Sequence, residues 1–281
     1  MQVNYNGTLF PHHALTIPAG NRALQYGDAV FETMRLLNGK PCFVERHLHR
    51  LQHACELLHM ELPEVVSKSA LNAAIGQLAQ ANGVTGSGRV RLTVMRNEGG
   101  RYTPETNTCS YLLECDPYAG DAFELNAEGL SMDLYEEHRK SIGPLGAIKS
   151  TNAMLYVLAG VEKQRRGLDR MLLLNDLANL AEEIASNVFL VLNGVLYTPS
   201  LNQGCLPGVM RSVIIDIAAE HRMEVQECPL SPGVLFKADE VFLTNALQGI
   251  QWVGSYRHKE YESVLAAKFV GLLNAFLANG H

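Results

Sequence analysis

Hydrophobic and polar positions repeat along this chain with two periods, which predicts both helices and strands. Residues 89–94 alternate polar and apolar side chains, the pattern of a half-buried strand. Residues 45–60 place Leu48, Leu51 and Cys55 on one stripe at helical spacing. Similar patterns predict strands at residues 29–37, 110–115, 170–174, 188–192, 195–198 and 240–244, and helices at residues 64–82, 152–166, 209–222 and 263–277. The expected fold class is therefore α/β (α+β).

Turn residues divide the chain. Asn6-Gly7 and Asn193-Gly194 each lie between short apolar runs and predict hairpins. Residues 116–121 are rich in turn formers and predict a domain boundary. We therefore expect a small N-terminal α/β domain over residues 1–118 and a larger C-terminal domain over residues 119–281, since 281 residues suffice for two modest cores.

Composition narrows the classes of function. Hydrophobic residues make up 47% and charged residues 19% of the chain, which indicates a globular protein. The net charge of -6 argues against a nucleic-acid partner. No secretory signal and no membrane span is expected, because the start lacks a basic and apolar leader and the longer apolar segments are broken by charges. Six scattered cysteines predict unpaired thiols in a reducing cytoplasm.

Three separated blocks carry the candidate chemistry. The longest runs from Glu182 to Arg211, beginning EEIASNVF and ending LPGVMR. The others are QYGDAVFET at residues 25–33, followed by HLHRL at 47–51, and IKSTN at 148–152. In order and spacing these blocks resemble the class IV aminotransferases, the fold-type IV pyridoxal-phosphate enzymes. That family includes branched-chain aminotransferase, D-amino-acid aminotransferase and aminodeoxychorismate lyase, and the resemblance covers nearly the whole chain.

The resemblance implies two α/β domains, pyridoxal 5′-phosphate in the interdomain cleft, and a homodimer. It assigns Lys149 as the lysine whose amine binds the cofactor covalently and later carries the substrate's Cα proton. Lysine suits this task because the cofactor's aldehyde requires an amine. Without the surrounding motif, Lys149 would be interpreted as an exposed loop lysine.

The resemblance also assigns a carboxylate to the cofactor's ring nitrogen. A carboxylate raises the pKa of that nitrogen and keeps it protonated. Glu182 holds the position, five residues before Asn187, and the adjacent Glu183 is interpreted as a solvated or structural carboxylate.

Phosphate binding calls for backbone N–H groups and positive charge. Residues 207–210 open a predicted helix, so the resemblance assigns the amides of Val209 and Met210 to the phosphate, with Leu206 packed on the ring. Arg50 is assigned the charge-assisted contact.

A second phosphate-side loop is expected where the strand at residues 240–244 ends. Asn245 and Ala246 occupy it, with the contact expected from the Asn245 side chain or from the backbone.

The substrate pocket has two candidate arginines, because a carboxylate calls for such a group. Arg101 resembles an arginine that one subunit lends to the other's site in D-amino-acid aminotransferase, and it is the preferred candidate. Arg91 resembles a pocket arginine of branched-chain enzymes. Phe31 takes the place of an aromatic pocket wall, with plain core packing as an equal alternative.

Two conspicuous features are given ordinary interpretations. His47, His49, His53 and His59 do not place three side chains on one helix face, so they predict a polar face and no metal site. Gly99-Gly100 lacks the lysine and hydroxyl of a phosphate loop and predicts a flexible tip.

Three functions remain open. An aminotransferase acting on an α-amino acid and a 2-oxo acid, of branched-chain or D-amino-acid type, is preferred. An aminodeoxychorismate lyase, which releases pyruvate and needs no amino acceptor, is the alternative, and residues 209–211 and 244–247 favour it. A non-catalytic protein that binds pyridoxal phosphate is the third, against which Lys149, Glu182 and Arg50 together argue.

Overall fold

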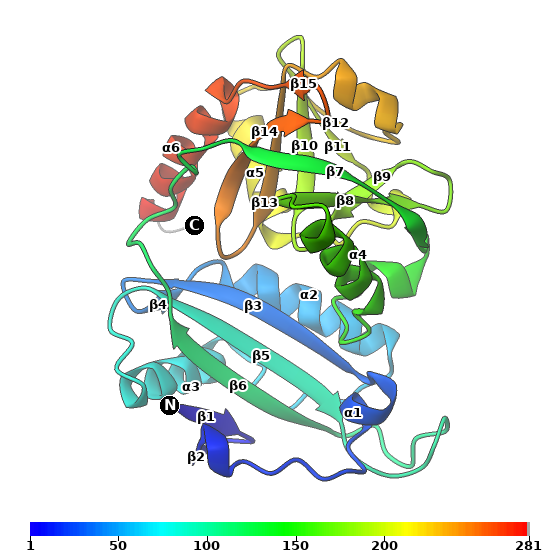
Figure 1. The fold of residues 1–281 in the computed structure, drawn as a ribbon. Helices are drawn as coiled ribbons and strands as arrows, with labels where there is room; N and C mark the ends of the chain where they lie inside the picture. The colour runs from blue at the N-terminus through cyan, green and yellow to red at the C-terminus, as the bar shows by residue number, and fades with distance from the viewer. Residues whose placement is uncertain (280–281) are drawn as a thin grey trace. The chain divides into compact units, whose positions relative to one another are not determined.

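Residues 1–279, which the computed structural model describes, form two compact units (Figure 1). The first unit comprises Met1–Ala122 and Ile148–Asn152, and the second comprises Phe123–Ala147 and the chain from Ala153 onward. The sequence pattern assigns residues 119–281 to a single domain, whereas the structure groups the short segment around Lys149 with the first unit. This grouping comes from backbone pairing between segments far apart in the chain, which no local pattern signals.

The first unit is built on an antiparallel six-stranded sheet with the order β2-β1-β6-β5-β3-β4. Its strands are β1 (Gln2–Tyr5), β2 (Thr8–Pro11), β3 (Ala29–Leu37), β4 (Lys40–Pro41), β5 (Gly88–Arg96) and β6 (Cys109–Pro117). The predicted hairpin at Asn6-Gly7 is confirmed, since β1 and β2 pair on either side of it.

Helices α1 (Arg22–Tyr26), α2 (Val44–Leu57) and α3 (Lys68–Ala81) complete the first unit. The core joins α2, α3 and the inner face of the sheet; its members include Val30 and Met34 of β3 with Leu48 and Leu51 of α2. Helix α3 begins later than predicted because the Ser67 side chain caps it by accepting from an amide of its first turn.

The second unit holds a nine-stranded mixed sheet with the order β12-β11-β10-β13-β14-β7-β8-β9, and β15 pairs with β14. Its strands are β7 (Leu130–Lys140), β8 (Arg170–Asn175), β9 (Leu180–Glu183), β10 (Asn187–Leu192), β11 (Val195–Pro199), β12 (Val225–Cys228), β13 (Glu240–Asn245), β14 (Gly249–Tyr256) and β15 (Lys259–Glu260). The predicted hairpin at Asn193-Gly194 is confirmed by the pairing of β10 with β11.

Three helices accompany this sheet: α4 (Met154–Arg165), α5 (Val209–Glu220) and α6 (Val264–Ala278). Helices α5 and α6 pack together and against β13, while α4 packs on β7 and β8 around Tyr135 and Leu173. Short 3₁₀ helices lie at His12–Ala14 in the first unit and at Pro144–Ala147, Leu201–Gln203 and Pro232–Phe236 in the second. Among residues 1–279, no helix has the length and apolar character to cross a membrane.

Candidate active site

Backbone hydrogen bonds place Lys149 along the first half of β3. The Phe31 amide donates to the Lys149 carbonyl over 2.9 Å, and the Thr151 amide donates to the Ala29 carbonyl over 3.0 Å. Strand β4 pairs only with the far end of β3, so this half of the strand edge receives the lysine segment instead. The backbone of Lys149 is thereby held while its side chain stays half-buried.

Two of the predicted pocket residues lie beside Lys149. The Lys149 Nζ is 4.3 Å from the centroid of the Phe31 ring, and the Arg91 guanidinium carbon is 3.8 Å from it. Arg91 pairs with Thr33, and Thr33 shares a face of β3 with Phe31 because side chains alternate along a strand. Lys149, Phe31 and Arg91 therefore form one group, in which burial lowers the pKa of Arg91 and the nearby Glu114 opposes this.

A buried carboxylate that the sequence analysis did not single out lies one residue further along β3. Glu32 accepts hydrogen bonds from Arg50 Nε and Nη2 over 2.8 and 2.5 Å, and its Oε2 lies 2.6 Å from His47 Nδ1. Burial alone raises the pKa of Glu32, but the charges of Arg50 and His47 outweigh it and lower the pKa to about 2. Glu32 is therefore ionised at neutral pH and fixes the orientation of Arg50.

The structure corrects the interpretation of His47 as part of a polar helix face. Its side chain is 1% exposed, and its Nε2 is buried without a hydrogen-bond partner. Burial lowers the pKa of His47, although the attraction of Glu32 opposes this shift. The signal was available, because His47, Leu51 and Ala54 follow helical spacing on the buried face of α2. His49, His53 and His59 are exposed, and residues 1–279 contain no metal-binding cluster of His, Cys, Asp or Glu side chains.

In the second unit, Glu182 lies on β9 within a buried polar cluster. Its Oε1 accepts from the Tyr156 hydroxyl over 2.7 Å and lies 2.8 Å from the Lys140 ammonium, while its Oε2 accepts from the Leu206 amide over 2.7 Å. Burial and the Glu182 charge raise the pKa of Tyr156, so its hydroxyl remains a donor. No motif marks Lys140 or Tyr156, which explains why the sequence analysis missed both.

Strand alternation separates Glu182 from its neighbour Glu183. Glu183 is buried and accepts a hydrogen bond from the Ala185 amide over 2.9 Å. Burial raises the pKa of Glu183. Glu183 thus stabilises the turn that follows it, whereas Glu182 binds the Leu206 amide just before helix α5.

Helix α5 offers unpaired amides at its N-terminus. Gly208 caps the helix without any side-chain hydrogen bond, and the first helical amides, including those of Val209 and Met210, have no acceptor within the helix. A Cβ on Gly208 would lie 1.8 Å from Asn187 Oδ1, so the chain requires glycine there. Such a helix end suits an anion such as a phosphate.

The end of β13 offers a further polar group. The Asn245 Oδ1 accepts from the amides of Leu247 and Gln248 over 3.0 and 2.8 Å, so this side chain closes a turn and leaves the backbone near Ala246 as the available contact. The Thr244 hydroxyl is buried without a hydrogen-bond partner. An orphaned buried hydroxyl is rare in native proteins and is consistent with a ligand at this turn.

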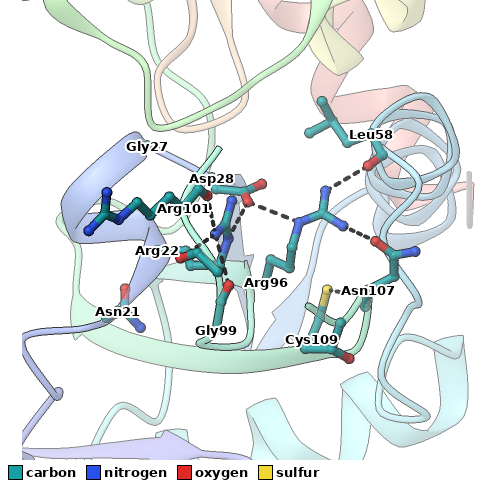
Figure 2. Close-up of polar contacts among 12 residues, drawn as sticks. Asn21, Arg22, Gly27, Asp28, Leu58, Arg96, Gly99, Arg101, Asn107 and Cys109 are labelled. Atoms are coloured by element: carbon teal, nitrogen blue, oxygen red, sulfur yellow. Dashed lines mark hydrogen bonds and ion pairs between the residues drawn. The ribbon is translucent and has the colours of Figure 1, made fainter. Parts of the chain in front are cut away.

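Arg101 lies on the loop at residues 97–108 that joins β5 to β6. Its side chain is exposed, and its carbonyl accepts a hydrogen bond from Arg22 over 2.7 Å (Figure 2). The predicted site residues thus fall into three places in the structure: the edge of β3, the β9 and α5 region, and this loop.

These residues fit a cofactor that carries an aldehyde, a ring nitrogen and a phosphate. The first unit supplies an amine beside an aromatic ring, and the second supplies a buried carboxylate, an uncapped helix N-terminus and an unpaired hydroxyl. These are the groups that a pyridoxal-phosphate enzyme requires, and each unit of this mixed α/β fold carries some of them.

Comparison with known proteins specifies the family. The amino-transferase class IV family matches residues 29–256, so the chain belongs to it. Class IV aminotransferases use pyridoxal 5′-phosphate, and this is the cofactor of the chain. Their substrates are small-molecule amino acids and keto acids.

Individual relatives show the same relationship. A putative branched-chain-amino-acid aminotransferase of Methanocaldococcus jannaschii is 28% identical over 87% of this chain and 84% of its own length. A D-alanine aminotransferase of Listeria innocua is 29% identical over 87% and 84%. The solved structure of a putative 4-amino-4-deoxychorismate lyase from Legionella pneumophila superposes with a TM-score of 0.85 at 26% identity, covering 94% of this chain and 96% of that one.

The Glu32 network predicts how stability depends on pH. Glu32→Gln should lower the free energy of unfolding at pH 7 by about 3 kcal/mol, because it breaks a buried ion pair. Since the pKa of Glu32 is lowered to about 2, its contribution is complete above the unfolded-state pKa of about 4.3 and declines as the pH falls toward 2. Urea denaturation across this range should therefore show the difference between wild type and variant shrinking in acid.

Glu45→Gln is the matched control, because Glu45 forms an exposed ion pair with Lys68 and should leave stability unchanged. A Glu32→Gln variant that is as stable as wild type at pH 7 would contradict the prediction.

Proposed function

We propose that this class IV aminotransferase exchanges an amino group between an α-amino acid and a 2-oxo acid at Lys149. The observation that carries the proposal is the Lys149 side chain against the Phe31 ring, beside the buried Glu32 network on the same strand. When bound, pyridoxal phosphate supplies an aldehyde for the lysine amine and a ring that withdraws electrons from the substrate's Cα.

Lys149 has two tasks in this proposal. Its amine holds the cofactor covalently between reactions. Once the substrate's amine has displaced it, the Lys149 amine removes the proton from the substrate's Cα and delivers it to the former aldehyde carbon of the cofactor. The fixed backbone of Lys149 supports both tasks, because a proton carrier must return to the same position in every turnover.

Glu182 is the proposed partner of the cofactor's ring nitrogen. Its carboxylate is ordered by Tyr156, Lys140 and the Leu206 amide, so it can hold a proton on that nitrogen without first reorganising. Leu206 itself would pack against the ring.

Several groups together would bind the phosphate. The proposed ligands are the amides of Val209 and Met210, the backbone at Asn245 and Ala246, and the Arg50 guanidinium. We add the Thr244 hydroxyl, which is buried and unpaired at the same turn. Glu32 accepts hydrogen bonds from two of the five guanidinium N–H donors of Arg50, which supports a fixed orientation of the Arg50 side chain.

Arg101 is the proposed ligand of the substrate's α-carboxylate, lent by one subunit to the other. Its exposure supports this role, since a lent side chain must extend beyond its own subunit. Arg91 is the second candidate, supported by its position beside Phe31 and Lys149.

A homodimer is part of this proposal. Met154, Val157 and Val161 are 69%, 54% and 60% exposed at helical spacing on α4, and Tyr102 beside Arg101 is 92% exposed. Exposed apolar side chains on one face of a helix, as on α4, are typical of a protein interface.

We also propose a cytoplasmic location without nucleic-acid or membrane partners. All six cysteines are unpaired, which suits a reducing compartment.

The proposed substrates are branched-chain amino acids or D-amino acids, as in the two aminotransferase relatives. Aminodeoxychorismate lyase is a second candidate, favoured by the Legionella structure and by residues 244–247.

Absorbance of the purified holoenzyme should separate these candidates. An aminotransferase should lose its visible band on mixing with one stereoisomer of its amino acid and regain it with a 2-oxo acid. The lyase should keep the band with every amino acid and release pyruvate from aminodeoxychorismate. A band that no amino acid changes, together with no release of pyruvate from aminodeoxychorismate, would contradict both enzymatic functions.

Removing the lysine amine should abolish activity. Lys149→Ala should lose the visible band and lower kcat by at least about a thousandfold, since covalent attachment and proton transfer act together. Lys237→Ala, which removes an exposed lysine, is the control and should keep both properties. A Lys149→Ala enzyme with normal turnover would remove Lys149 from the site.

The two arginines should differ in their effect on KM. Arg101→Met should raise KM for an amino acid by about tenfold to a hundredfold, as expected for a lost ion pair with a carboxylate, and leave an amine substrate without a carboxylate unaffected. Arg91→Met should change KM less. Steady-state kinetics with both substrates measures this, and the reverse order of the two variants would assign the carboxylate to Arg91.

A further inference from the structure

One buried arginine of the first unit has no part in the proposed cofactor site. Arg22 on α1 is only 4% exposed. Arginine side chains are rarely buried unless they are paired, so the partners of Arg22 are of interest. Its Nε donates to Asp28 Oδ2 over 2.8 Å, and its Nη1 donates to the carbonyls of Gly99 and Arg101 over 3.1 and 2.7 Å. Figure 2 shows the guanidinium between the Asp28 carboxylate and the loop backbone.

Asp28 extends this contact to the other end of the loop. Its Oδ2 also accepts from Arg96 Nε over 2.9 Å. Arg96 in turn donates to the Asn107 side chain and to the Leu58 carbonyl (Figure 2). One carboxylate therefore joins two guanidinium groups, and these hold the loop at residues 97–108 near its beginning and near its end.

The loop backbone itself has a tight conformation. Gly99 and Gly100 adopt φ of +120° and +69°, and a Cβ on Gly100 would lie 2.0 Å from the Thr103 carbonyl oxygen. The Tyr102 ring packs against the Tyr26 ring with centroids 5.6 Å apart, and the Arg22 guanidinium lies 5.0 Å from the Tyr26 ring. The glycine pair thus forms a tight turn in the structure.

Arg101 is held only through its backbone in this arrangement. Its carbonyl is bound by Arg22, while its exposed side chain points away from these contacts (Figure 2). Arg22 Nη1 also donates to the Gly100 carbonyl over 3.5 Å, so the carbonyls on both sides of the Arg101 Cα are bound, and this restricts the direction of its Cα–Cβ bond.

We propose that Arg22 is a positioning residue that fixes the loop backbone and thereby directs the Arg101 guanidinium toward the substrate's carboxylate. This inference rests on the proposed role of Arg101. Bidentate binding of a carboxylate requires a planar guanidinium in a defined orientation, and a loop ordered before binding adds no ordering cost to the reaction.

The test combines kinetics with amide hydrogen exchange on the holoenzyme. Arg22→Met should raise KM for the amino acid by about tenfold, change kcat less than about twofold, and leave KM for an amine without a carboxylate unchanged. In the Arg101→Met background the same substitution should add no further rise in KM, since Arg22 acts through Arg101. Exchange of the amides at residues 99–104 should become faster.

Arg22→Lys separates positioning from folding. Lysine retains a charge beside Asp28 but cannot bind the carboxylate and two carbonyls together, so it should give an intermediate KM and intermediate exchange, and it replaces Arg22→Met if that variant does not fold. Lys68→Met, which removes an exposed cation of the same unit, is the control and should behave as wild type.

Three results would overturn the inference: unchanged exchange at residues 99–104 in Arg22→Met, an unchanged KM for the amino acid, or an equal rise in KM in the Arg101→Met background. An Arg101→Met enzyme with normal KM would contradict the proposed function separately. In that case, faster amide hydrogen exchange at residues 99–104 in Arg22→Met would still show that Arg22 anchors the loop.

Discussion

The arrangement around Lys149 depends on a backbone pairing between segments more than a hundred residues apart. The segment Ile148–Asn152 occupies the edge of β3 that β4 leaves unpaired, with the Phe31 amide bound to the Lys149 carbonyl. Unpaired amides and carbonyls at a sheet edge are costly when buried, so this edge requires a partner. The same pairing links two of the motif blocks: residues 148–152 carry the lysine, and residues 25–33 carry the start of the strand that holds it.

Close approach is needed at one further point of this pairing. Gly27 precedes β3 with φ of +65°, and a Cβ there would lie 2.4 Å from the Asn152 side chain. The Gly27 carbonyl accepts from the Thr151 hydroxyl and from Asn152 Nδ2. Glycine at position 27 and the polar pair after Lys149 are therefore parts of one contact.

Two carboxylates near the start of β3 each bind a pair of basic groups. Asp28 binds Arg22 and Arg96, and Glu32 binds Arg50 and His47. Burial is possible because each charge is compensated and hydrogen-bonded. One short stretch of chain thus organises both the loop that carries Arg101 and the helix that carries Arg50.

How far the sequence predicts this molecule depends on whether a feature is local. Hairpins marked by Asn-Gly pairs and helices with a clear stripe were predicted correctly, because turn chemistry and periodicity act over a few residues. Strands β7 and β14 were not predicted, because β7 ends in a run of charged residues and β14 contains two glycines. Their pairing with neighbouring strands, which lie far away in the sequence, makes them strands.

The same division holds within the candidate site. Motifs identified the residues proposed to contact ligands, such as Lys149 and Glu182. They did not identify Arg22, Lys140 and Tyr156, which hold other groups in place, because such a residue is defined by the contacts it makes across the fold. A supporting residue can be replaced by any group that reaches the same partner, so its type leaves little trace in a short pattern, whereas a cofactor-binding lysine can only be a lysine.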